Sequence, residues 1–154
     1  MPKINDMKTF KTILLAEDNP NDVELTLAAL ADLNLANPIV VVKDGVEAIE
    51  YLRCEGKFSE RKRENPAVLL LDIKMPRMDG IEVLQIIREE PSLKLIPVVM
   101  LTSSREEPDL VNCYKLGSNA YVVKPVDYKE FMTAIKNLGI FWALINELPP
   151  EGGI

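Results

Sequence analysis

The chain has 154 residues, of which 47% are hydrophobic, and its 24 acidic and 18 basic side chains give a net charge of -6. This length fits a single domain with a sizeable core, and the composition excludes a disordered chain. The acidic balance disfavours non-specific binding to nucleic acid or to a membrane surface, because anionic nucleic acid and anionic lipid both repel an acidic protein.

No feature of the sequence indicates a membrane-spanning or secreted protein. No apolar run approaches the ~18 residues that a membrane-spanning helix needs. The first ten residues, MPKINDMKTF, lack the apolar core of a signal peptide. The two cysteines, Cys54 and Cys113, are too few for a disulfide framework and lack the spacing of a metal knuckle. We therefore expect a cytoplasmic protein with two reduced thiols.

The sequence contains no histidine. This absence excludes Ser-His-Asp and Cys-His activation of a nucleophile, zinc sites of the HExxH type, and a role as phosphohistidine donor. If the chain takes part in phosphoryl transfer, it must be the acceptor.

Five short aliphatic runs are predicted to be strands. Each run is continuously apolar rather than alternating, which is typical of strands that are buried on both faces of a sheet. The runs are residues 12–16, 38–42, 67–71, 97–101 and 120–123.

Amphipathic stretches with helical period separate these runs. The inward positions that this period predicts are Val23, Leu27, Leu30 and Ala31 in the first helix, Ala48, Ile49 and Leu52 in the second, Leu84 and Ile87 in the third, Val111 and Tyr114 in the fourth, and Phe131, Ile135 and Leu138 in the fifth.

The order of elements is therefore a strand and a helix, repeated five times. This alternation predicts a parallel sheet with helices on both faces and right-handed crossovers. Five strands suit a single α/β domain with a flavodoxin-like, doubly wound (βα)5 fold and the strand order 2-1-3-4-5. Residues 55–66 (EGKFSERKRENP) form a polar connection longer than the usual ~2 to 6 residues, which we expect to be a solvated loop.

Polar side chains gather where the predicted strands end. Glu17 and Asp18 follow the first strand, and Asp72 follows the third. Thr102 follows the fourth strand and Lys124 the fifth. Sites in such sheets form at the carboxyl ends of the strands, beside the point where the strand order reverses. The three carboxylates are therefore expected to converge and to need a cation, and hard oxygen ligands with room for water suit Mg²⁺.

A lysine and a hydroxyl beside such a cation would form a cradle for a phosphoryl group. Asp72 would be the nucleophile, since an aspartate can form an acyl phosphate. Taken alone, the acidic pair is better explained as the cap of a helix start, Asp72 as a turn residue and Thr102 as a helix cap, and a lysine before a proline is a weak signal. Capping does not explain their joint occurrence at four strand ends, which favours a phosphoacceptor site.

Four motifs carry a resemblance to a known family: ILLAEDN, LLLDIKMPRMDG, PVVMLTSS and AYVVKPVD. Through them residues 11–138 resemble the response-regulator receiver domains of two-component signalling. Residues 1–10 would then be an N-terminal extension, and residues 139–154 an apolar C-terminal extension. The resemblance implies a stand-alone signalling protein rather than an enzyme, phosphorylated by a sensor histidine kinase in a Mg²⁺-dependent reaction and assisting its own phosphorylation and dephosphorylation.

The resemblance also implies a role for each matching residue. Glu17 stands where an aspartate is more familiar, and its carboxylate can still reach a metal through water. The implied roles are phosphoacceptor and metal ligand for Asp72, direct metal ligand for Asp18, water-mediated ligand for Glu17, carbonyl ligand for the backbone of Lys74, phosphoryl contacts for Thr102 and Lys124, aromatic switch for Tyr121, a cis bond before Pro125, and shaping of the turn after the acceptor for Met75, Pro76, Asp79 and Gly80.

Further stretches resemble the small regulators partnered with phytochrome-type sensor kinases, namely NPNDVELTLAAL and LGSNAYVVKPVDYKEF followed by LGIFWALIN. This resemblance implies such a kinase as partner and, without a DNA-binding output domain, a downstream protein or phosphotransfer domain as recipient of the signal. Apolar residues from Leu138 to Leu148 are crowded around the predicted helix more than one buried face explains. We expect a homodimer through this segment, with folding back over its own sheet as the alternative.

Two other functions are alternatives, a phosphatase and, on the same fold, an interaction module. A phosphatase of the haloacid-dehalogenase type also uses an aspartate and Mg²⁺, but it needs a second carboxylate two residues after the nucleophile, where this chain has Lys74. The other is an interaction module that acts without phosphorylation. The full set of site residues argues against that module.

Overall fold

The computed structural model describes residues 11–103, 117, 120–139 and 144. Within them the chain forms one five-stranded parallel sheet with the strand order β2-β1-β3-β4-β5, which confirms the predicted fold. The strands are β1 (Ile13–Ala16), β2 (Ile39–Val42), β3 (Val68–Asp72), β4 (Val98–Thr102) and β5 (Ala120–Val123). The predicted fourth helix, with Val111, Cys113 and Tyr114, lies outside the described residues.

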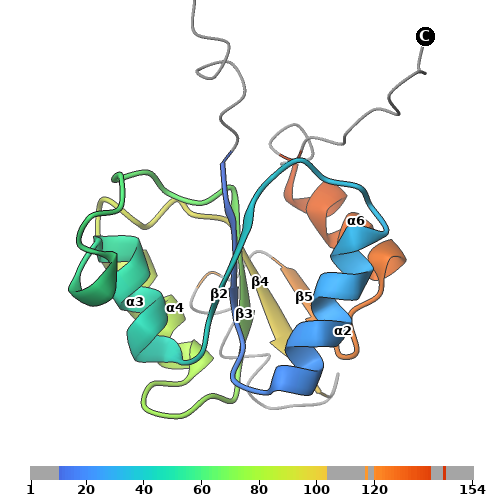
Figure 1. The fold of residues 1–154 in the computed structure, drawn as a ribbon, viewed down its shortest axis with the longest axis horizontal. Helices are drawn as coiled ribbons and strands as arrows, with labels where there is room; N and C mark the ends of the chain where they lie inside the picture. The colour runs from blue at the N-terminus through green and yellow to red at the C-terminus, as the bar shows by residue number, and fades with distance from the viewer. Residues whose placement is uncertain (1–10, 104–116, 118–119, 140–143, 145–154) are drawn as a thin grey trace, which may run out of the picture.

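Helices cover both faces of the sheet (Figure 1). The helices α3 (Gly45–Arg53) and α4 (Gly80–Glu89) pack on one face, and α2 (Pro20–Ala31) and α6 (Tyr128–Leu138) pack on the other. A short 3-10 helix, η1 (Gly56–Phe58), follows α3. Each of these α-helices begins at a capping residue, whose side chain accepts hydrogen bonds from backbone N–H groups of the first turn. These capping residues are Asn19, Asp44, Asp79 and Asp127.

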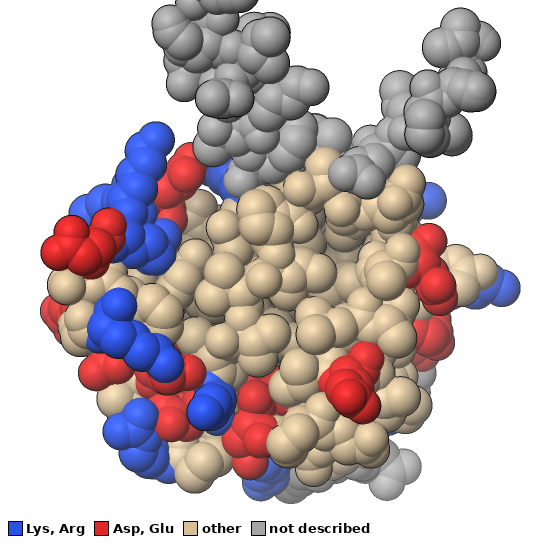
Figure 2. All heavy atoms as spheres, viewed as in Figure 1, with Lys and Arg blue, Asp and Glu red and all other residues tan. Residues whose placement is uncertain are grey.

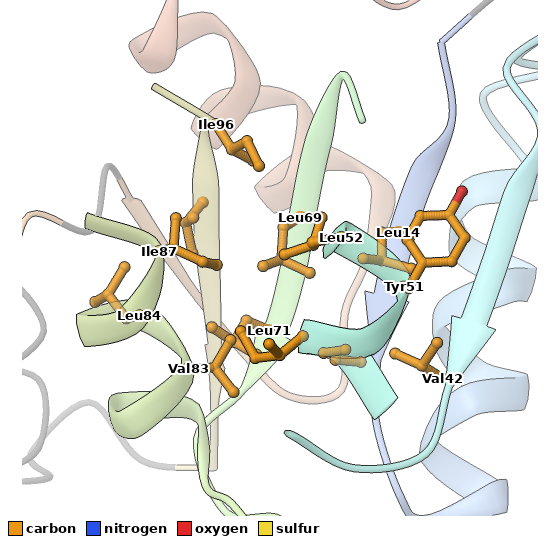
Figure 3. Packing of buried hydrophobic residues seen from close by; sticks show 14 of the residues in the cluster. Leu14, Val42, Tyr51, Leu52, Leu69, Leu71, Val83, Leu84, Ile87 and Ile96 are labelled. Atoms are coloured by element: carbon orange, nitrogen blue, oxygen red, sulfur yellow. The ribbon is translucent and has the colours of Figure 1, made fainter. Parts of the chain in front are cut away.

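The sheet divides the core into two apolar layers because alternate strand residues point to opposite faces. Figure 3 shows the layer beneath α3 and α4, where Leu69 and Leu71 of β3 point toward Val83 and Ile87. The opposite layer contains Leu70 and Phe131, which have no exposed surface. Leu144 is buried in this second layer, so one residue of the predicted C-terminal extension packs against its own domain.

The structure corrects the expectation that every strand is buried on both faces. The central strands β1, β3 and β4 are fully buried, but the edge strands β2 and β5 are not. Val41 in β2 keeps 38% of its surface exposed. The space-filling view, in which β2 lies toward the viewer, accordingly has a largely uncharged centre (Figure 2). An apolar run in the sequence does not say whether its strand is central or at an edge.

The predicted inward stripe of α2 is wrong at one position. Leu30 is buried as expected, but Ala31 is exposed, and Thr26 and Ala29 are buried instead. Successive helical residues are about 100° apart, so a face centred on Thr26 and Leu30 carries Ala31 away from the sheet. The prediction missed the centre of this face because it counted only apolar residues, and the buried residue at the centre is a threonine.

The connection at residues 55–66 is not a simple solvated loop. Phe58 packs edge-on against Tyr51, with the ring centroids 5.1 Å apart. The Arg61 guanidinium lies 3.9 Å from the centre of the Tyr51 ring and donates hydrogen bonds to the carbonyl oxygens of Tyr51 and Glu64. The connection is therefore anchored on α3, although most of its charged side chains are exposed. In the part of the chain that the structure describes, no helix is long and apolar enough to cross a membrane.

Replacing Gly80 by alanine should destabilise the protein. A Cβ atom at this position would lie 2.2 Å from the backbone carbonyl oxygen of Asp72. Because the clashing atom belongs to the backbone, no change of side-chain rotamer can relieve the contact. We expect the free energy of unfolding to fall by roughly 1–3 kcal/mol, the usual cost of overpacking. Gln85→Ala, at an exposed position of the same helix, is the control and should leave stability nearly unchanged. Urea unfolding measures both, and a Gly80→Ala protein as stable as the control would contradict the expected clash.

Candidate functional site

The candidate site lies at the carboxyl ends of the strands, the lower edge of the sheet in Figure 1. Ala16 of β1 pairs with Leu71 of β3, so the residues that follow them, Glu17 and Asp72, lie side by side. Carboxylate oxygens of Glu17, Asp18 and Asp72 all lie within 4.8 Å of one another. Glu17 and Asp72 are buried and Asp18 is exposed. The structure thus brings together the three carboxylates predicted as metal ligands.

These carboxylates line a pocket together with residues from all the neighbouring strand ends. Every residue predicted for the site lines it except Tyr121. The lining residues are Glu17, Asp18, Asn19, Asp22, Asp72, Ile73, Lys74, Thr102, Ser103 and Lys124.

Lys124 crosses the pocket from the end of β5 and joins its acidic groups. Its ammonium nitrogen lies 3.2 Å from Asp72 Oδ1, 3.2 Å from Glu17 Oε1 and 3.0 Å from Asp22 Oδ2. The strand order led us to expect Lys124 to face the same site as Glu17 and Asp72. Sequence reasoning missed Asp22, whose only signal was its place one helical turn beyond Asp18.

Thr102 occupies the predicted position, whereas Tyr121 is not among the residues that line the pocket. Thr102 is buried at the end of β4, where its carbonyl oxygen accepts a 2.7 Å hydrogen bond from the backbone N–H of Lys124. Tyr121 is half-buried and packs against the core layer beneath α3 and α4. The peptide bond between Lys124 and Pro125 is cis, as the resemblance implied.

The turn that follows Asp72, residues 73–80, is held by a backbone hydrogen bond between its ends and by a side chain in its middle. The backbone N–H of Gly80 donates to the carbonyl oxygen of Ile73 at 2.8 Å. Arg77, whose φ of 66° is left-handed, forms two hydrogen bonds with the Asp44 carboxylate at 3.0 and 3.1 Å. This turn carries Lys74 to the rim of the pocket, next to Asp72.

The carboxylates in the pocket lie close together and change the pKa values of Asp72 and Lys124. Burial and, after it, the neighbouring Glu17 charge raise the pKa of Asp72 from 3.8 to about 7, although Lys124 opposes the shift. Burial would lower the pKa of Lys124, but the hydrogen bond to Asp22 and the charges of Asp72 and Glu17 raise it above its usual value. Lys124 therefore stays positively charged, whereas the charged form of Asp72 is disfavoured.

The residues present fit a divalent metal ion. Three carboxylates offer hard oxygen donors from two neighbouring strand ends, and the unfavourable charge on Asp72 is what a nearby cation would relieve. Glu17, Asp18 and Asp72 would hold the ion, and the backbone of Lys74 is at hand on the pocket wall.

The raised pKa of Asp72 predicts a pH dependence of stability without metal. The folded protein keeps the Asp72 proton between pH ~4 and ~7 while the unfolded chain has released it, so the free energy of unfolding falls as the pH rises through this window. Asp72→Asn removes the titrating carboxyl group and with it this pH dependence. In EDTA, the loss of stability between pH 5 and pH 8 should be smaller in the variant by about 1–3 kcal/mol. Urea unfolding of both proteins at each pH gives the comparison, and equal losses would contradict it.

Comparison with known proteins agrees with this geometry. Response regulator Rcp1 of Synechocystis sp. is 34% identical over 90% of this chain and 93% of its own, and its Mn²⁺-bound structure, covering 90% of this chain and 99% of that chain, has a TM-score of 0.71. The bacteriophytochrome response regulator RtBRR is 56% identical, with a TM-score of 0.84 over 92% of this chain and 86% of its own. The phosphorylated cyanobacterial phytochrome response regulator RcpA is 40% identical, with a TM-score of 0.71 over 87% and 94%. Residues 13–136 match the response regulator receiver domain, and the chain belongs to that family.

Proposed function

We propose that Asp72 accepts a phosphoryl group from the phosphohistidine of a sensor histidine kinase. A carboxylate oxygen of Asp72 forms the new bond to phosphorus, the bond from phosphorus to the kinase nitrogen breaks, and the imidazole leaves with that electron pair. The carrying observation is that Asp72, buried at the sheet edge, lies within 4.8 Å of two other carboxylates and 3.2 Å from the Lys124 ammonium. This arrangement combines a nucleophile with positive charge for the phosphoryl oxygens.

We propose Mg²⁺ as the metal, bound by Glu17, Asp18, Asp72 and the backbone carbonyl of Lys74. Rcp1 has been solved with Mn²⁺, a divalent ion that, like Mg²⁺, suits carboxylate, carbonyl and water ligands. Such an ion would neutralise the crowded carboxylates and the incoming phosphoryl oxygens.

We propose that Thr102 and Tyr121 convert phosphorylation into a change of surface. The phosphoryl group adds about -1.5 to -2 charges beside the buried Thr102. A move of the Thr102 hydroxyl toward the phosphoryl group would open space for Tyr121, which already packs against one core layer. Phosphorylation would then stabilise an arrangement that the free protein samples.

We propose that the protein is cytoplasmic and that its partner is a phytochrome-type sensor kinase. The support is the similarity to RtBRR and RcpA, which are named as phytochrome response regulators. Rcp1 is a further similar response regulator. The recipient of the signal would be a downstream protein or a phosphotransfer domain. Residues 11–138 would form the receiver domain, preceded by a short extension at residues 1–10 and followed by the apolar segment at residues 139–154.

Phosphorylation by a small donor tests the central proposal. The protein is incubated with acetyl phosphate and Mg²⁺, and its intact mass is measured. We expect wild type to gain one phosphoryl group with release of acetate, and no gain in EDTA or in Asp72→Asn. Asp32→Asn, at the exposed end of α2, removes the same charge elsewhere and should behave as wild type.

The other outcomes separate the alternative functions. Release of many phosphates per protein without a stable mass gain would indicate a phosphatase. An unmodified wild type would contradict the proposal and leave a binding module that acts without phosphorylation.

We also propose a homodimer formed through residues 139–154. Leu144 of this segment is buried in its own domain, while Trp142 lies outside the described residues. Sedimentation of the wild type should give a dimer, and Trp142→Asp should give a monomer because a charge in an apolar interface is costly. A wild type that stays monomeric at high concentration, or a variant that stays dimeric, would contradict the dimer.

A further inference from the structure

Lys124 has as many carboxylate partners as it has N–H donors. Its ammonium group carries three hydrogens, and it contacts Asp22, Glu17 and Asp72 at 3.0, 3.2 and 3.2 Å. Glu17 and Asp72 belong to the carboxylate group that could hold a metal ion, whereas Asp22 does not. Asp22 is thus the one partner that can hold Lys124 without also being a metal ligand.

The start of α2 fixes where Asp22 lies. Pro20 begins the helix, and the Asn19 side chain accepts a 3.1 Å hydrogen bond from the backbone N–H of Asp22. From this first turn the Asp22 carboxylate reaches the pocket wall, where 28% of its side chain and 15% of that of Lys124 are exposed. The pair is therefore partly shielded from water and retains more of its attraction than a surface ion pair.

We propose that Asp22 is a positioning residue that holds Lys124 in the unphosphorylated protein and competes with the phosphoryl group for it. The inference rests on the function proposed above. A phosphoryl group on Asp72 brings three acceptor oxygens and extra negative charge to an ammonium whose three donors are already engaged. Lys124 must release one carboxylate to bond to it. Releasing Asp22 keeps the contact with Glu17 and leaves the ammonium group beside Asp72.

A purely structural role for Asp22 makes a different prediction. An acidic residue in the first turn stabilises a helix through its dipole. If Asp22 did nothing more, its replacement would lower the stability of α2 and would leave the affinity of the pocket for a phosphoryl group unchanged or weaker. Competition for Lys124 instead predicts tighter binding.

Binding of beryllofluoride, a phosphoryl analogue, at saturating Mg²⁺ tests the inference. Asp22→Asn keeps the shape of the side chain but offers Lys124 a neutral acceptor, which forms a weaker hydrogen bond. We expect the Kd measured by calorimetry to fall roughly threefold to tenfold relative to wild type. Asp22→Glu restores the charge and should return the Kd toward the wild-type value. Glu24→Gln removes an exposed charge from the same helix and should change nothing.

Each outcome decides the inference. An Asp22→Asn protein that binds beryllofluoride no more tightly than wild type, or an Asp22→Glu protein that binds as tightly as Asp22→Asn, would overturn the role of Asp22 while the proposed function stands. A wild type that neither binds beryllofluoride nor gains mass from acetyl phosphate would overturn both.

Discussion

The contact between one lysine and a group of buried carboxylates is the interaction on which the site depends. Glu17 and Asp72 lie next to each other with almost no access to water, and the Glu17 charge disfavours the charged form of Asp72. Lys124 offsets part of this repulsion from 3.2 Å on both sides. The ammonium can do so because it is itself partly buried, so the attraction is not screened as it would be at the surface.

The fold creates this contact through strand register and close backbone approaches. Parallel pairing of β1 with β3 carries Glu17 to the side of Asp72, and pairing of β4 with β5 carries Lys124 to the end of the same edge. Two glycines allow the turn after Asp72 to pack closely: a Cβ atom at Gly45 would meet the Met78 carbonyl oxygen at 2.1 Å, and one at Gly80 would meet that of Asp72. The pocket is therefore a consequence of backbone geometry that only glycine permits at these two points.

The alternation of strands and helices was enough to predict the fold because each crossover returns the chain to the same edge of the sheet. Strand ends then gave the convergence of Glu17, Asp18 and Asp72 at one edge. The sequence did not predict the contact of Asp22 with Lys124, because 102 positions separate the two residues and only the fold brings the first turn of α2 and the end of β5 to the same pocket. It also did not predict the anchoring of Arg61 on Tyr51, since a charged connection gives no sign of which ring it will cover.

The raised pKa of Asp72 has a consequence for how such a site is maintained. A carboxylate with a pKa of about 7 destabilises the fold when it is charged, so the site opposes the stability that the two apolar layers supply. The same unfavourable charge gives a divalent cation something to relieve, and any ion that binds the folded chain alone also stabilises it. Cation binding to Glu17, Asp18 and Asp72 would therefore be coupled to folding stability. A neutral residue at position 72 would remove the electrostatic strain and, with it, both the proposed nucleophile and part of the attraction that the acidic group offers to a cation.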